Sequence, residues 1–156
     1  MSDVDRMIPE LLEQALQTLA FVSIDALEPD CPPPAAMLLV SVSFSGPSAD
    51  GALEMAAVPE LGKLLALNLL VDEQNGPRTI SDTQAADALK ELANVTCGLV
   101  IGQFVSAGIA GPIEMGLPQA QRLDSSRNWP PFAADPGAHF FSAEGNPLAV
   151  RLRGAT

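Results

Sequence analysis

The chain contains no tyrosine, and among its 156 residues there are only one tryptophan, one histidine and two cysteines. Positively charged residues are also scarce. The chain has eight lysines and arginines but 19 aspartates and glutamates, which gives a formal net charge of −11. A nucleic-acid partner is therefore not expected, since neutralising phosphates requires a basic surface. A basic protein surface, or a substrate held together with a metal ion, matches this charge better.

Cysteine and histidine are too few to indicate a metal cluster or a hydrolytic triad. Cys31 lies in a proline-rich segment and Cys97 in a helical pattern, so they suggest neither a disulfide framework nor a zinc site. We expect both to be free thiols in a reducing compartment. His139 precedes two phenylalanines without metal-ligand spacing or a supporting triad motif, which favours a structural role.

The sequence predicts neither a signal peptide nor a membrane span. The first residues show no basic stretch followed by an apolar run, so we expect a cytoplasmic protein. Residues 92–113 carry no charge and are numerous enough to cross a bilayer, but they include Asn94, Gln103, Pro112 and four glycines. This composition predicts a buried helix followed by a strand.

Hydrophobic periodicity predicts a single α+β domain over residues 1–156, an antiparallel sheet with packed helices. Ser81 and Gln84 have the spacing of a capping box, which marks the start of the longest helix. Gly98 and Gly102 suggest that this helix packs closely against a neighbour. The predicted helices cover 5–21, 59–70 and 81–104; the strands cover 37–44, 52–57, 113–117, 139–143 and 148–152; loops cover 27–36, 72–80 and 119–137.

The most informative residues lie on the helix predicted over 81–104. Asp87, Glu91 and Asn94 are spaced i, i+4 and i+7, which places them on one helix face opposite an apolar face. A rigid, core-anchored helix holding a carboxylate and a carboxamide suits a site that orders a water or grips a partner. Spacing alone favours a plain solvated face, although asparagine is a poor helix former for such a position.

The first predicted helix contains a weak internal repeat of this motif, which we call the echo. Residues 11–17 can be aligned with residues 88–94, which places Gln14 on Glu91 and Gln17 on Asn94. Amphipathic helices produce much of this pattern, so it is weak evidence for a duplication.

The string Asp-Ala-Leu-Lys-Glu-Leu-Ala-Asn over 87–94 resembles the CheC/CheX/FliY family of chemotaxis phosphatases, and the CheX-like members among them. The family pattern is Asp or Ser, three residues, Glu, two residues, Asn, and a downstream Pro. Residues 44–47 and 64–70 are also similar to CheX-type sequence, and the resemblance extends over about 8–152. Leu117 holds the expected place of the Pro, which here follows as Pro118.

The resemblance implies an enzyme that hydrolyses the aspartyl phosphate of a CheY-type response-regulator receiver domain. Asn94 would orient the attacking water, much as a glutamine does in GTPases, and Glu91 would dock to the receiver's lysine. Asp87 would lie at the contact edge. The receiver supplies Mg²⁺, so no metal ligand or cofactor of its own is expected, and the CheX-like relatives imply a homodimer.

Two other functions remain open from the sequence. The chain could be a non-catalytic CheX-like adaptor that binds a receiver domain, or a relative of flagellar switch components that assembles through its sheet edges. The lifetime of the receiver's phosphate distinguishes the phosphatase from the adaptor.

Overall fold

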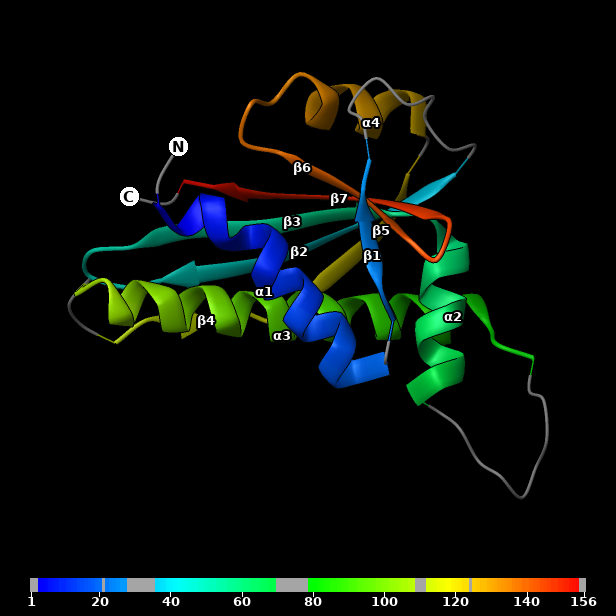
Figure 1. The fold of residues 1–156 in the computed structure, drawn as a ribbon, viewed down its shortest axis with the longest axis horizontal. Coiled ribbons are helices and arrows are strands. Elements are labelled where there is room, and N and C mark those ends of the chain that lie inside the picture. The colour runs from blue at the N-terminus through cyan, green and yellow to red at the C-terminus, as the bar shows by residue number, and fades with distance from the viewer. Residues whose placement is uncertain are drawn as a thin grey trace.

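The computed structural model describes residues 3–20, 22–27, 36–69, 79–108, 112–123 and 125–154 (Figure 1). A mixed helix and antiparallel-sheet architecture is observed, which confirms the predicted α+β class. The helices are α1 (Asp3–Ala20), α2 (Pro59–Leu69), α3 (Asp82–Ser106) and α4 (Ser125–Ala133); the strands are β1 (Ile24–Ala26), β2 (Met37–Ser45), β3 (Asp50–Ala57), β4 (Glu114–Met115), β5 (Gln119–Leu123), β6 (His139–Ala143) and β7 (Asn146–Arg153).

The strands expected over 37–44 and 52–57 form one hairpin, β2 with β3, and those expected over 139–143 and 148–152 form another, β6 with β7; the two hairpins join to form the centre of the sheet. The strand order is β1-β6-β7-β3-β2-β4, and β5 also pairs with β2. The central pairing of β3 with β7 sets Met55 opposite Val150 and Leu53 opposite Leu152. Side chains of successive strand residues point to opposite faces, so this register directs one apolar row of each strand towards the same face.

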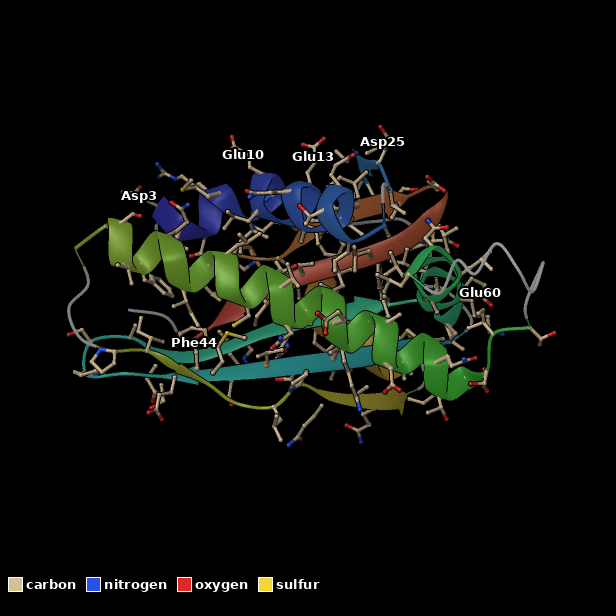
Figure 2. The ribbon with its side chains drawn as sticks, turned by 90° about the horizontal axis from the view of Figure 1, so that it is seen from below. Asp3, Glu10, Glu13, Asp25, Phe44 and Glu60 are labelled. Atoms are coloured by element: carbon tan, nitrogen blue, oxygen red, sulfur yellow. The ribbon has the colours of Figure 1, made fainter. Side chains whose placement is uncertain are left out.

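Helices cover both faces of the sheet. Helices α1, α2 and α3 lie on one face, and Figure 2 shows Phe44 of β2 beneath the C-terminal half of α3. The alternate strand residues, among them Met37, Ala56 and Ala149, face the other way and pack with Trp129 and Phe132 of α4. The larger core therefore supports α3, while a small second core holds α4.

The segment 119–137, expected as a loop, instead contains β5 and α4. Strand β5 was missed because its sequence is polar, and it is defined by its pairing with β2, in which Ala120 lies opposite Val40. Helix α4 was missed because Pro130 and Pro131 suggest a break in regular structure. The burial of Trp129 stabilises the helix in spite of the prolines.

Smaller differences follow from long-range pairing. Strand β1 was not expected and forms by pairing with β6, and the strand expected over 113–117 is only Glu114–Met115. The expected loops over 27–36 and 72–80, with Cys31, fall mainly on 28–35 and 70–78, outside the described residues.

None of the helices in the described part of the chain combines the length and the hydrophobicity that a membrane span requires.

The close helix packing expected at Gly98 and Gly102 is wrong, and the glycine at a close contact is Gly62 in α2. A Cβ built on Gly98 or Gly102 meets nothing within 4 Å. A Cβ on Gly62 would lie 2.5 Å from the carbonyl oxygen of Ala85 in α3. Gly62 therefore permits α2 to approach the backbone of α3 just before the predicted motif.

Replacing Gly62 by Ala should destabilise the protein, whereas the same change at Gly98 should stabilise it. At Gly62 the added methyl group pushes against a backbone carbonyl, and we expect the free energy of unfolding to fall by about 2 kcal/mol. At Gly98 the methyl group enters open space and improves helix propensity, and we expect a gain of about 0.5–1 kcal/mol. Urea unfolding of the two variants measures this contrast, and equal effects would contradict the packing at Gly62.

Candidate functional site on helix α3

Helix α3 is fixed at both ends, so its exposed face has a defined position. At the N-terminus the Ser81 hydroxyl accepts a hydrogen bond from the Gln84 backbone N–H at 3.1 Å, and the Ser81 backbone N–H donates to the side-chain oxygen Oε1 of Gln84 at 2.9 Å. This is the capping box expected from the sequence. Near the C-terminus Phe104 packs against Phe44 of β2, with ring centroids 5.7 Å apart.

One face of α3 is buried along its whole length. These residues are Ala85, Ala88, Leu89, Leu92, Ala93, Thr96, Cys97, Val100 and Phe104. The buried Thr96 hydroxyl donates a hydrogen bond to the Leu92 carbonyl oxygen at 2.7 Å. Burial raises the pKa of the Cys97 thiol to about 11, so this cysteine is a neutral core residue at physiological pH.

The structure brings Asp87, Glu91 and Asn94 together on the opposite face of α3, as expected. Asp87 and Glu91 are exposed and Asn94 is half-buried. Asp87 has Lys90 as an ion-pair partner at 3.9 Å. No described residue hydrogen-bonds to or pairs with the side chain of Glu91 or Asn94. Their polar atoms are therefore free to contact a partner, and the buried face of α3 fixes their spacing.

Two hollows flank this face, and the sequence indicated neither of them. The first, which we call the apolar groove, lies between α2 and α3 and has a volume of about 270 Å³. The second, the basic hollow, lies between α3 and β5 and has a volume of about 280 Å³. The apolar groove is lined by Ala66, Leu69, Gln84, Asp87, Ala88 and Glu91; the basic hollow is lined by Leu38, Pro59, Asp82, Thr83, Ala86, Asp87, Lys90, Ala120 and Arg122.

The basic hollow brings together charges from distant parts of the chain. Asp82, in the first turn of α3, pairs with Arg122 of β5 at 3.3 Å and with Lys63 of α2 at 3.8 Å. Because β5 was expected as a loop, nothing in the sequence placed Arg122 beside the motif. Asp87 lines both hollows and so separates them.

The remaining candidate residues lie elsewhere. His139, on β6, stacks on Phe141 with ring centroids 6.4 Å apart, and burial lowers its pKa despite the opposing effect of Asp5. Gln14 and Gln17, the echo of the motif, are exposed on α1, which packs against α3. Within the described ranges, no group of three or more His, Cys, Asp or Glu side chains could hold a metal ion.

The sequence of the matched region identifies the family. The family model described as chemotaxis phosphatase CheX matches residues 38–126, more than half of the chain and all of α3. The chain belongs to the CheX family. This result confirms the resemblance to the CheC/CheX/FliY group, whereas no curated protein sequence matches significantly.

Solved structures agree with the CheX fold at low sequence identity. The chemotaxis protein CheX from Vibrio vulnificus is 12% identical with a TM-score of 0.70, over 97% of this chain and 95% of that chain. A chain of the CheX–CheY–BeF₃–Mg²⁺ complex from Borrelia burgdorferi is 16% identical with a TM-score of 0.60, over 96% of each chain. FliY from Thermotoga maritima is 15% identical with a TM-score of 0.60, over 98% of this chain and 91% of that chain.

Proposed function

We propose that this CheX-family protein accelerates the hydrolysis of the aspartyl phosphate on a CheY-type receiver domain. The observation that carries the proposal is the exposed face of α3, where Glu91 and Asn94 have no partner among the described residues. This face lies inside the region that matches a chemotaxis phosphatase family. A solved relative was crystallised with CheY, BeF₃ and Mg²⁺, which supports a receiver as the partner.

Asn94 is the proposed water-positioning residue. A carboxamide offers both a hydrogen-bond donor and an acceptor, so it can hold a water in line with the phosphorus atom. The water oxygen attacks phosphorus, the bond to the aspartyl oxygen breaks, and the products are inorganic phosphate and the receiver's free carboxylate. Phosphoryl transfer depends mainly on positioning and charge stabilisation, which a fixed helix supplies without covalent chemistry.

The receiver, and not this chain, would supply the Mg²⁺ that the reaction needs. Bound to the receiver, this ion would neutralise charge on the phosphoryl oxygens during transfer. The chain would then need to contribute only the docking carboxylate and the carboxamide.

Glu91 is the proposed docking residue for the receiver's lysine, and reversing its charge should weaken binding. In the complex the pair is shielded from water, so a lysine at position 91 would face another lysine at close range. For Glu91→Lys we expect the Kd for the receiver to rise about tenfold or more. Titration calorimetry with a beryllofluoride-treated receiver measures the change.

Glu13→Lys provides the matched control for this variant. Glu13 is exposed on α1 and, like Glu10, projects away from the sheet (Figure 2). It undergoes the same charge change at a distance from the α3 face. Equal affinities of the two variants would show that net charge, and not docking by Glu91, determines binding.

The decay of the receiver's phosphate tests the function itself. We expect a phosphorylated CheY-type receiver with Mg²⁺ to lose its phosphate faster when this protein is added. A demonstrated complex with unchanged decay would instead establish the adaptor function.

A further inference from the structure

The few cations of this acidic protein are unevenly distributed. The structure describes six basic side chains: Arg6, Lys63, Lys90, Arg122, Arg151 and Arg153. Two of them, Lys90 and Arg122, line the basic hollow, and a third, Lys63, lies next to it and pairs with Asp82 of its lining. They come from α2, α3 and β5, so the tertiary fold and not local sequence assembles this positive region.

The cations of the basic hollow are only loosely held within the chain. Lys63 and Arg122 share the single carboxylate of Asp82, at 3.8 and 3.3 Å, while Lys90 lies 3.9 Å from Asp87. The hollow itself is lined by two cations and two carboxylates, and Lys63 beside it adds a third positive charge. The side chains of Lys63 and Arg122 are about half exposed, and Lys90 is about one-third exposed, at 46%, 58% and 35%. Exposed ion pairs of this kind are weak, so an arriving carboxylate can compete for the cations.

The apolar groove, on the other side of Asp87, differs from the basic hollow in its charge. The described lining of the apolar groove includes the carboxylates of Asp87 and Glu91 but no lysine or arginine. Its remaining lining is made by Ala66, Leu69, Ala88 and the Gln84 amide. The two hollows therefore differ in charge: the charged residues in the described lining of the apolar groove are the carboxylates of Asp87 and Glu91, whereas cations and carboxylates lie side by side in the basic hollow.

We propose that the basic hollow binds carboxylates on the surface of the receiver domain and thereby sets the rotation of the receiver about the α3 axis. This inference rests on the proposed function, because it assumes that the receiver docks on α3. A receiver that places its lysine on Glu91 would gain attraction by presenting carboxylates towards Lys90 and Arg122. The opposite orientation would place like charges together on both sides, which is strongly unfavourable.

A purely structural role for these cations is the competing explanation. In that case Asp82 with Lys63 and Arg122 would only tie α2, α3 and β5 together. The variant Asp82→Asn separates the two explanations, because it breaks both ion pairs while leaving the cations free for a partner. Docking predicts tighter binding of the receiver by Asp82→Asn, and a structural role predicts weaker binding.

The test compares the affinity of a beryllofluoride- and Mg²⁺-loaded CheY-type receiver for four proteins: wild type, Lys90→Glu, Arg122→Glu and Arg6→Glu. We expect each reversal in the basic hollow to raise the Kd about fivefold to tenfold at low ionic strength, and less at high ionic strength. Arg6→Glu is the matched control, because Arg6 is an exposed arginine paired with Asp3 at 3.6 Å on α1. It should leave the Kd close to that of wild type.

The possible outcomes separate this inference from the proposed function. If the Lys90→Glu and Arg122→Glu variants bind like Arg6→Glu, the inference is overturned, whatever the phosphatase measurement shows. If these variants lose affinity while Asp82→Asn gains it, the inference is supported, even if Asn94→Ala retains its activity. If wild type binds no loaded receiver, both the inference and the proposed function are overturned.

Discussion

Replacing Asn94 by Ala should lower the rate acceleration of receiver dephosphorylation about a hundredfold. The protein should stay folded and still bind the receiver. The carboxamide is the proposed group that aligns the attacking water, and misplacement of a reactant by a small distance costs about this factor. The methyl group of alanine can neither donate to nor accept from the water. Because Asn94 is half-buried and makes no hydrogen bond to a described residue, its loss leaves no orphaned polar group.

Two further variants sharpen this experiment. Asn94→Asp keeps the shape but removes the donor and brings a negative charge close to the phosphoryl group, so we expect a loss at least as large as for Ala. Gln17→Ala, at the exposed echo position on α1, should keep the activity of wild type. The decay of the phosphorylated receiver at saturating protein measures all three. Full activity of Asn94→Ala, or inactivity of Gln17→Ala, would show that the site is misplaced.

Replacing Arg151 by Met should cost about 3 kcal/mol of folding free energy, the largest stability effect that we expect from a charged residue. Arg151 is only 13% exposed, and its guanidinium donates to Glu54 at 2.8 and 3.0 Å. It also donates to the Pro131 carbonyl at 3.2 Å and to Asp135 at 3.4 Å, and it lies 4.3 Å from the ring centroid of Phe132. Arg151 therefore connects the sheet to the end of α4.

The stability loss arises mainly from the carboxylates that remain. Without Arg151, Glu54, itself only 14% exposed, keeps only the exposed Arg153 at 3.1 Å, and Asp135 loses its ion pair with Arg151. A poorly solvated carboxylate that loses its main partner is strongly destabilising. We expect the melting temperature to fall by roughly 6–12 °C in a thermal scan.

Arg153→Met is the matched control for this prediction. Arg153 is also on β7 and also pairs with Glu54, but its side chain is 61% exposed and makes a single contact with this carboxylate. We expect a loss below about 1 kcal/mol. If both arginine variants unfold at the same temperature, the network around Arg151 does not hold α4 on the sheet.

Local sequence signals predicted the parts of the fold that depend on neighbouring residues. The capping box at Ser81 correctly predicted the start of α3, and the alternation of apolar and polar residues correctly predicted β2 and β3. Both signals depend on residues that are close together in the sequence. Strand β5 and helix α4 depend on tertiary partners, namely the edge of β2 and the second core around Trp129. A window of sequence does not contain those partners.

The same distinction applies to the site. The common face of Asp87, Glu91 and Asn94 follows from helix geometry alone, so the sequence was sufficient to predict it. The surroundings of this face, with Arg122 on one side and Ala66 on the other, are assembled by the tertiary fold. Gly62 illustrates the same limit, because its close contact is with the backbone of α3 and has no sequence signature.

The expected homodimer stays a prediction. The outer strands of the sheet, β1 at one edge and β4 with β5 at the other, expose backbone groups that a second copy could cover. Sedimentation at several protein concentrations tests it.

Release of inorganic phosphate from a phosphorylated CheY-type receiver, present in large excess over this protein and with Mg²⁺, tests the central claim most directly. We expect many phosphates to be released per molecule of wild-type protein, at a rate proportional to its concentration and almost absent with Asn94→Ala. Release at the receiver's own rate, unaffected by the wild-type protein, would contradict the phosphatase function.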